Sequence, residues 1–387
     1  MSNFDFETIF VRENSDSLKY DVPLGVLPLS IADMDFATCP AVLEAVKKRA
    51  SEGIFGYVES KDSWYQSYIS FFRRRHGLKI QKEEMTFITG VVPALSCSVR
   101  CFSKVGDHVV TITPVYNIFF HSIENNGRKT LMVPLLKNEG GYALDFKKIE
   151  EAFALPSTSL CLFCNPQNPI GIIWKKEDLA RLARLAKKYD VTILSDEIHG
   201  EIVEPGQSYC PFFSSCPEAE EVGVMATSPT KCFNLAGIQT ACVVVKNPLL
   251  REKIRVQINQ DEVGEPNVFS CLAAEAAWNQ GETWLEEAKK VLFSNRRLAE
   301  DYIEENIPGL KPIRGEATYL LWIDASKVCK DSERLCEFLQ KNARVGLNPG
   351  SEYGLGGEGY LRMNLAYPKK VLLEGLKRLK NGIEHFK

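Results

Sequence analysis

The chain has 387 residues, of which 45% are hydrophobic and 25% are charged, a composition typical of a folded globular protein and unlike disordered, collagen-like or coiled-coil chains. At roughly 150 residues per domain, this length predicts two or three domains. The 47 basic residues almost balance the 50 acidic ones, and the net charge of −3 excludes the strongly basic surface of proteins that bind nucleic acid or anionic membranes.

Predicted strands and helices alternate through the first two thirds of the chain. Pro40 favours the start of a helix and Gly53 favours its end. Further helical patterns are expected at 62–76, after residue 93, at 116–126 and at 177–189. Short apolar or β-rich runs predict strands at 85–89, 107–113, 159–164, 191–195, 222–227 and 240–246. This alternation predicts an α/β core with a mainly parallel sheet.

The last third of the chain has a different pattern. Residues 266–306 are almost entirely helical in pattern, and a strand at 319–324, a helix at 332–342 and a closing helix from Lys369 follow. We therefore expect a smaller α+β domain here, and we expect the residues before Thr38 to form an arm that packs on it. The expected large domain spans 48–282, and the small domain combines 1–47 with 283–387.

The expected location is the cytoplasm. The opening residues lack the basic and apolar regions of a signal peptide, and no apolar run approaches the ~18 residues that a membrane-spanning helix needs. The 12 cysteines should stay reduced there, and no set of them has the spacing of a zinc site. Cys161 and Cys164 lie inside one apolar run, so we interpret them as core side chains of a strand rather than as a redox or metal pair.

Two polar motifs follow predicted strands. Lys231 ends the segment Ser228-Pro229-Thr230-Lys231, in which hydroxyls and turn amides suit a phosphate and the amine suits an aldehyde. Asp196, in Ser195-Asp196-Glu197-Ile198-His199, comes at the end of an apolar strand, where α/β proteins bind ligands. This second motif is also similar to the DExH box of helicases, but the chain lacks the phosphate-binding loop that such enzymes need.

Three further segments are candidates for the same site. Asn168 lies in a tight loop, Asn165-Pro166-Gln167-Asn168-Pro169-Ile170-Gly171, after a predicted strand. Gly90, Val91 and Val92 precede a predicted helix, and free amides at such a start suit an anion. Arg362 lies within an apolar strand, where its guanidinium requires a partner. Either a substrate carboxylate or an internal salt bridge could provide that partner.

Taken together and in this order, these residues resemble the fold-type I enzymes that use pyridoxal phosphate, over nearly the whole chain from about Pro28. The resemblance implies a three-layer α/β large domain and a smaller α+β domain. It also implies that Lys231 carries the cofactor and acts as the catalytic residue, that Asp196 pairs with the pyridine nitrogen, and that Asn168 bonds the phenolic oxygen. Tyr116 looks like the aromatic side chain that stacks on the ring.

The same resemblance assigns the remaining site residues. Ser228 and Thr230, with the amides of Val91 and Val92, would hold the phosphate. Arg362 would bind the substrate carboxylate. No metal is implied.

The resemblance narrows to the MalY/PatB group on four segments taken together: Ile31-Ala32-Asp33-Met34-Asp35-Phe36, Phe55-Gly56-Tyr57, Gly90-Val91-Val92-Pro93 and Ser195-Asp196-Glu197-Ile198-His199. In that group His199 would lie near the phenolic oxygen, and Met34 could line the substrate pocket. Tyr57 would reach the phosphate of the neighbouring subunit, which implies a homodimer with the site at the interface. Gln239 departs from the pattern, because many aminotransferases have an arginine at this position, eight residues after the lysine.

The resemblance implies a carbon–sulfur β-lyase that releases pyruvate, ammonia and a thiol from cystathionine or a cysteine S-conjugate. Among enzyme activities, the alternative to a lyase is an aminotransferase with the same cofactor. A regulatory or binding protein that has kept the fold is the alternative outside them, since a fold does not determine a function.

Overall fold

A mixed sheet forms the centre of the large α/β part, in the strand order β2-β10-β9-β8-β7-β3-β4. The structure is a computed structural model that describes residues 4–138 and 141–386. The strands of this sheet are β2 (Met85–Ile88), β3 (His108–Thr113), β4 (Lys129–Pro134), β7 (Thr158–Cys164), β8 (Thr192–Asp196), β9 (Gly223–Thr227) and β10 (Ala241–Val244). Strand β10 runs antiparallel to both of its neighbours, and the other pairings are parallel. The predicted, mainly parallel sheet is therefore confirmed.

Both faces of the sheet are buried, which explains why its strands are nearly continuous apolar runs. Successive residues of a strand point to opposite faces. In β7, Cys161 and Phe163 accordingly belong to the core on one face, and Leu162 and Cys164 belong to the core on the other. The interpretation of the two cysteines as core side chains is confirmed, since both are almost fully buried.

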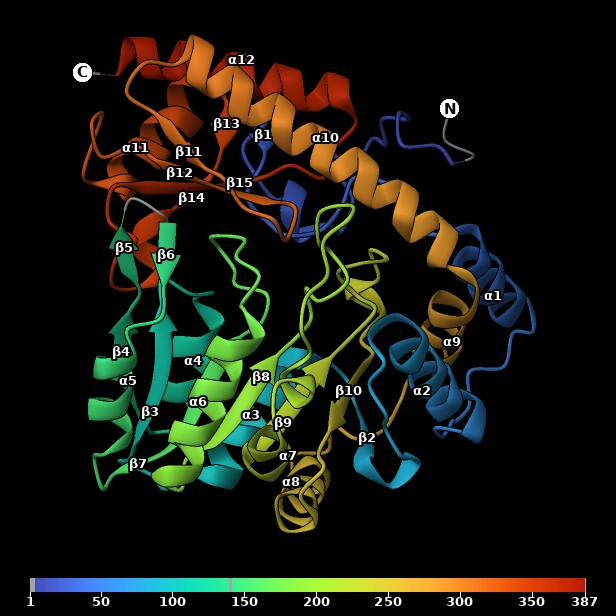
Figure 1. The fold of residues 1–387 in the computed structure, drawn as a ribbon. Helices are drawn as coiled ribbons and strands as arrows, with labels where there is room; N and C mark the ends of the chain where they lie inside the picture. The colour runs from blue at the N-terminus through green and yellow to red at the C-terminus, as the bar shows by residue number, and fades with distance from the viewer. Residues whose placement is uncertain (1–3, 139–140, 387) are drawn as a thin grey trace.

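Helices cover both faces of the sheet (Figure 1). Their side chains divide between the two cores, and this gives the three layers that the resemblance implies. One face is covered by α3 (Val91–Phe102), α4 (Ile118–Glu124) and α8 (Pro248–Gln260). The other is covered by α1 (Pro40–Ser51), α2 (Asp62–His76), α5 (Phe146–Phe153), α6 (Lys176–Lys188), α7 (Pro217–Val222) and α9 (Ser270–Gln280).

A second sheet, in the order β11-β12-β15-β14, organises the smaller part of the molecule. Its strands are antiparallel: β11 (Lys311–Ile313), β12 (Leu320–Asp324), β14 (Asn348–Pro349) and β15 (Tyr360–Asn364). The helices around it are α10 (Glu282–Asn306), α11 (Ser332–Phe338) and α12 (Lys369–His385). The long helix α10 runs across the top of Figure 1 and connects this part to the large one. No helix within residues 4–138 and 141–386 has the length and apolarity to span a membrane.

The opening segment contacts both parts of the molecule, since Phe6 and Phe36 belong to the core of the large part. Strand β1 (Leu27–Pro28) pairs in parallel with β13 (Val345–Gly346). A separate hairpin, β5 (Leu136–Asn138) with β6 (Gly141–Ala143), rises from the large part towards the small one (Figure 1). The expected boundary between residues 47 and 48 falls inside α1, which packs on α9 of the large part.

Candidate active site

One pocket of about 260 Å³ lies at the carboxyl ends of the parallel strands, on the side facing the small part. In open α/β sheets, ligands bind in the crevice outside the carboxyl ends of the strands. Its lining combines residues 89–93 with Ala32, Leu95, Tyr116, Cys164, Asn168, Asp196, Ile198, His199, Thr230, Lys231, Ala236, Gln239 and Arg362. The pocket therefore gathers most of the predicted site residues.

Lys231 lies in the turn between β9 and η4 (Ala236–Ile238), and its Nζ donates a hydrogen bond of 2.6 Å to the carbonyl oxygen of Ala32. The turn is held by Ser228, whose Oγ donates to the Thr240 carbonyl and accepts from the amide of Thr230. Burial lowers the pKa of Lys231 to about 8, and the positive charge of Arg362 acts in the same direction. Its amine can therefore be neutral near physiological pH.

Asp196 ends strand β8 and is 5% exposed. Its Oδ1 accepts a hydrogen bond of 3.0 Å from the amide of Ile198. Burial raises the pKa of Asp196 to about 7, although that bond and the nearby Lys231 favour its charged form. A cationic partner in the pocket would return this carboxyl to its ionised state.

His199 is 3% exposed and lies on the same loop. Burial lowers the pKa of His199 to about 3, and the positive charges of Lys231 and Arg362 lower it further. The imidazole is therefore neutral at physiological pH. Its Nδ1 has no hydrogen-bond partner among the described residues, so it remains available to a ligand.

Arg362 is 3% exposed on strand β15, and its guanidinium binds neutral oxygen atoms. Its Nη2 donates to the carbonyl of Ser30 at 3.0 Å and to Oδ1 of Asn348 at 2.9 Å, and its Nη1 donates to Oδ1 of Asn168 at 3.3 Å. Within the described part of the chain, its Nε has no partner and no carboxylate forms an ion pair with it. Of the two predicted partners, the internal salt bridge is thus not present there, and the unpaired charge suits an anionic ligand.

The loop that carries Asn168 is fixed where the two parts of the molecule meet. Gly171 closes this loop at a φ of 83°, and a Cβ at this position would lie 2.7 Å from the carbonyl oxygen of Ala317. Glycine is therefore required here by both conformation and space. The side chain of Gln167 donates to the carbonyl of Pro114 at 2.7 Å and holds the loop from the other side.

The opposite end of the pocket is formed by the start of helix α3. The first backbone bond of this helix runs from the amide of Ala94 to the carbonyl of Gly90, so the amides of Val91 and Val92 are not used inside the helix. Together with the hydroxyl of Thr230 they form a cradle that suits an anion. Gln239 lies at the same pocket and brings no charge to it.

Not every predicted site residue lies in this pocket. Met34 is 1% exposed and packs in the hydrophobic core, while Ala32, two residues earlier, lines the pocket. Ser228 supports Thr230 from behind through a hydroxyl pair at 2.7 Å. Tyr57 is fully exposed and lies on the extended segment before α2.

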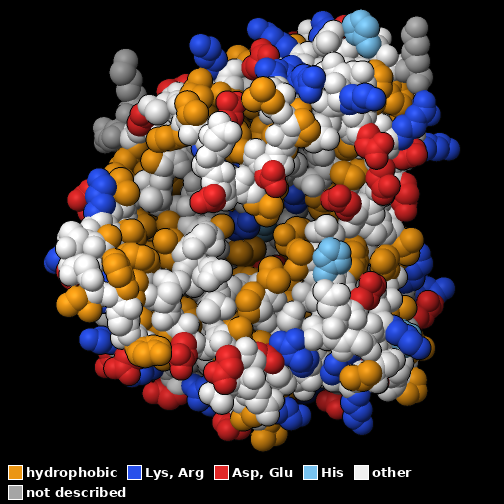
Figure 2. All heavy atoms as spheres, turned by 180° about the vertical axis from the view of Figure 1, so that it is seen from behind, with side chains coloured by type: hydrophobic (Ala, Val, Ile, Leu, Met, Phe, Trp, Pro, Cys, Tyr) orange, Lys and Arg blue, Asp and Glu red, His pale blue; other side chains and the backbone are white. Residues whose placement is uncertain are grey.

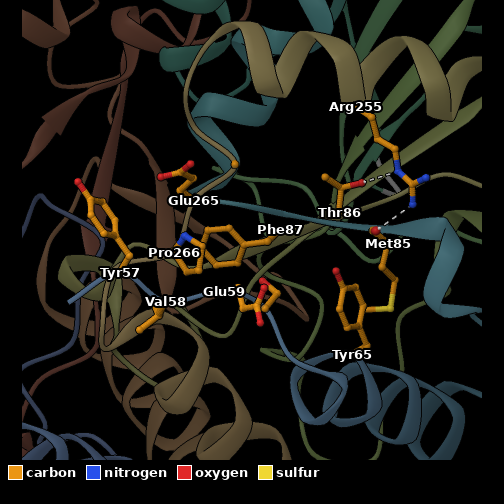
Figure 3. A pocket seen from close by; sticks show the side chains of 12 residues that line it. Tyr57, Val58, Glu59, Tyr65, Met85, Thr86, Phe87, Arg255, Glu265 and Pro266 are labelled. Atoms are coloured by element: carbon orange, nitrogen blue, oxygen red, sulfur yellow. Dashed lines mark hydrogen bonds between the residues drawn. The ribbon is translucent and has the colours of Figure 1, made fainter. Parts of the chain in front are cut away.

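Figure 3 shows the surroundings of Tyr57, a shallow depression of about 640 Å³. Val58, Glu265 and Pro266 line the same depression, and Arg255 on its far side bonds to Thr86 and Met85. Ile54 and Phe55, next along the chain, are 70% and 60% exposed. On the face seen in Figure 2, hydrophobic side chains gather around a central hollow that contains basic side chains. No group of three metal-binding side chains occurs among the residues that the structure describes.

Several residues of the site had no sequence signal. The carbonyl oxygen of Ala32 accepts a hydrogen bond from Lys231 and a second one, of 3.0 Å, from the hydroxyl of Tyr319. Asn364 and Asn348 position the chain around Arg362. A backbone carbonyl is present at every position, so only the fold determines which one faces a lysine.

The whole chain is similar to known proteins. A model of the family described as aminotransferase class I and II matches residues 25–379. Cystathionine beta-lyase PatB of Bacillus subtilis is 38% identical, over 96% of this chain and 98% of that protein. Protein MalY of Escherichia coli is 30% identical, over 98% of this chain and 99% of that protein.

Solved structures agree with the family match. The crystal structure of cystalysin from Treponema denticola, which contains a pyridoxal 5′-phosphate cofactor, superposes with a TM-score of 0.95 at 34% identity. The match covers 99% of this chain and 100% of that one. The fold expected from the resemblance is therefore confirmed. Since the family model spans most of its length, the chain belongs to the class I and II aminotransferase family.

Proposed function

We propose that this protein is a carbon–sulfur β-lyase that uses pyridoxal 5′-phosphate to eliminate a thiol from cystathionine or a cysteine S-conjugate, leaving pyruvate and ammonia. The observation that carries the proposal is the convergence of Lys231, Asp196 and an unpaired Arg362 on one pocket. The activity named for PatB and the cofactor of cystalysin support it. When bound, pyridoxal phosphate supplies an electron-poor ring that takes up the charge developing at the substrate Cα.

The polar atoms of the pocket fit this cofactor. The buried Nδ1 of His199 is without a described partner and can face the phenolic oxygen. The buried carboxyl of Asp196 gains its ionised state when it meets a protonated ring nitrogen. The free amides of Val91 and Val92 and the hydroxyl of Thr230 suit the phosphate.

The side chains of the pocket then have separate roles in the reaction. Arg362 binds the substrate carboxylate, and Asn168, already within 3.3 Å of its Nη1, fixes the orientation of the guanidinium. The amine of Lys231 removes the Cα proton, for which a pKa of about 8 provides a neutral fraction near physiological pH. Asp196 holds a proton at the ring nitrogen, and the neutral His199 adds a hydrogen bond without a charge.

Transamination is the second candidate function, favoured by the family to which the chain belongs. It shares the first proton transfer and differs in where the proton goes next. The test is to incubate the purified enzyme with cystathionine without any keto acid and to follow pyruvate. Continuous release supports the lyase, whereas one stoichiometric turnover that resumes only when a keto acid is added supports the aminotransferase.

We further propose a homodimer in which Tyr57 completes the phosphate site of the partner subunit. Its full exposure, beside the exposed Ile54 and Phe55, supports a contact that the single chain does not satisfy.

We also propose a cytoplasmic location. The described residues include 12 free cysteines, and this supports a reducing compartment.

A further inference from the structure

The segment 30–35 contributes Ala32 to one wall of the pocket, and donors from several elements fix the backbone of the segment. The Ala32 carbonyl accepts from Lys231 and Tyr319, and the carbonyl of Ser30 accepts from Arg362. The side-chain amide of Asn364 donates to the carbonyls of Ile31 and Asp33, at 2.6 and 2.8 Å. A shift of this segment would therefore displace both cationic side chains of the pocket.

A buried ion cluster lies behind this wall. The side chain of Lys19 is completely buried, and its Nζ lies 3.0 Å from Oδ1 of Asp33 and 3.4 Å from Oδ1 of Asp35. Arg12 pairs with both carboxylates, at 2.9 Å in the case of Asp33. The ring of Tyr367 closes the cluster 4.0 Å from the Lys19 ammonium. Lys19 and Asp35 are buried whereas Arg12 and Asp33 are partly exposed, and burying a charge is costly unless its partners remain in place.

The cluster acts on Lys231 with both signs of charge. The carboxylates of Asp33 and Asp196 raise the pKa of Lys231, whereas the positive charges of Arg362 and Lys19 lower it. Asp33 and Lys19 thus oppose each other at the same amine. The arm contributes a charge pair rather than a single charge.

The other titratable groups around the lysine are neutral. Burial lowers the pKa of His199 to about 3, and it raises the pKa of Tyr319 and of Tyr116 above its ordinary value. These side chains do not change their charge near physiological pH. Beside burial, which lowers the pKa of Lys231 most, the charges that act on its amine are therefore those of Arg362, Asp33, Asp196 and Lys19.

We propose that Asp33 and Lys19 are positioning residues that hold the 30–35 segment against Lys231 and tune how readily its amine takes a proton from the substrate. The inference rests on the proposed function, because it assumes that Lys231 is the lysine that bears the cofactor. It adds a role for the N-terminal arm, which supplies charge to a site built mainly on the large part.

A purely structural role would give a different result from this electrostatic one. If the cluster only anchored the wall, Asp33→Asn and Lys19→Met would loosen it alike and shift the titration of Lys231 in the same direction. If the charges act on the amine, the two variants shift it in opposite directions. Asp33→Asn disfavours the protonated amine and lowers its pKa, and Lys19→Met favours the protonated amine and raises it.

The experiment titrates the absorbance of the bound cofactor against pH in the holoenzyme. We expect a midpoint lower by about half a pH unit in Asp33→Asn and higher by a similar amount in Lys19→Met. Asp16→Asn removes the same charge from an exposed position of the arm and should leave the midpoint unchanged. Shifts of the same sign, or a midpoint in Asp33→Asn equal to that of the control, would overturn the proposal.

A second measurement works without the cofactor. Competitive labelling of the cofactor-free protein with acetic anhydride across pH, followed by mass spectrometry of the peptide that contains Lys231, reports the titration of the free amine, whereas the absorbance reports the same nitrogen when it carries the cofactor. The labelling should give a lower midpoint for Asp33→Asn than for the wild type. This result tests the effect of the Asp33 charge on Lys231 even if Lys19→Met does not fold. If the wild-type protein binds no cofactor, the proposed function is wrong. The labelling result still tests whether Asp33 and Lys19 shift the pKa of Lys231, because it needs no cofactor.

Discussion

Nη1 of Arg362 lies 3.3 Å from the side-chain oxygen of Asn168, although 194 positions separate the two residues in the chain. Arg362 belongs to a strand of the small part, and Asn168 belongs to a loop of the large sheet. A substrate carboxylate bound at this point, as we propose, would contact both parts of the molecule. Substrate binding and the relative position of the two parts are thus linked at one guanidinium.

We expect Arg362→Lys to raise KM by about 30- to 100-fold, because an ammonium cannot form the bidentate pair with a carboxylate. The steady-state kinetics of pyruvate release measure this. Arg314→Lys, at an exposed position, is the control and should leave KM unchanged. An unaltered KM in Arg362→Lys would place the substrate carboxylate elsewhere.

Replacing Lys231 with Ala removes the amine that takes the Cα proton, so turnover should fall by at least about 100-fold. The cofactor absorbance of the covalently attached form should disappear as well. Circular dichroism checks that the fold is kept, and Lys327→Ala, at an exposed lysine, serves as the control. Full turnover in Lys231→Ala would rule out this lysine as the base.

Mixed dimers test whether Tyr57 acts across the subunit interface. A hybrid of a Tyr57→Phe subunit with a Lys231→Ala subunit contains one site with its own lysine and an intact tyrosine from the partner. We expect the hybrid, separated by two affinity tags, to recover about half of the wild-type activity at limiting cofactor. The Tyr57→Phe homodimer should bind the cofactor about tenfold more weakly, as expected for one lost hydrogen bond. A hybrid no more active than its parents would argue that Tyr57 does not serve the partner's site.

The buried carboxyl of Glu197 should make stability depend on pH. Burial raises the pKa of Glu197 from 4.5 to about 7, although its carboxylate accepts hydrogen bonds from the amide of Phe212 and from Ser195. The folded form then binds the proton more tightly than the unfolded form. Its contribution to stability is present below about pH 4.5 and is lost as the pH rises through 7, up to about 3 kcal/mol in all.

Glu197→Gln removes this dependence while keeping an acceptor oxygen at the same place. Urea unfolding of the wild-type and variant proteins at pH 5 and pH 8 measures the difference. We expect the wild type to lose more stability than the variant between these two values. Glu358→Gln, at an exposed position, should behave like the wild type. An equal loss in wild type and Glu197→Gln would mean that this carboxyl titrates normally.

Much of the fold could be predicted because local pattern and tertiary environment agree. The strand expected at 159–164 is β7, whose apolar run follows from burial on both faces. Strand β4 was not predicted, because the run Lys129–Pro134 lies at the edge of the sheet and is only partly buried. The hairpin of β5 and β6 was also missed, since its short strands are exposed or partly exposed.

Some residues of the site could likewise be predicted from the sequence, and others could not. Polar side chains that interrupt a buried run, such as Asp196 and Arg362, can be identified from sequence because their burial needs a reason. Lys231 follows a predicted strand, so its position at the same edge of the sheet could be predicted as well. The contacts of the Ala32 carbonyl and the charge pair of Asp33 with Lys19 could not be predicted, because they depend on how the N-terminal segment packs against residues about 200 positions later in the chain.

The pairing of the first and last segments also determines when the site can exist during synthesis. The hydroxyl of Tyr367 donates to the carbonyl of Pro28, 339 positions earlier, and β1 has no strand to join until β13 has been made. A nascent chain can fold the large sheet on the ribosome, but its arm can pair only after residues 345–367 have been made. The wall that contains Ala32 is therefore assembled after the large sheet, and the enzyme can become active only once residue 367 has left the ribosome.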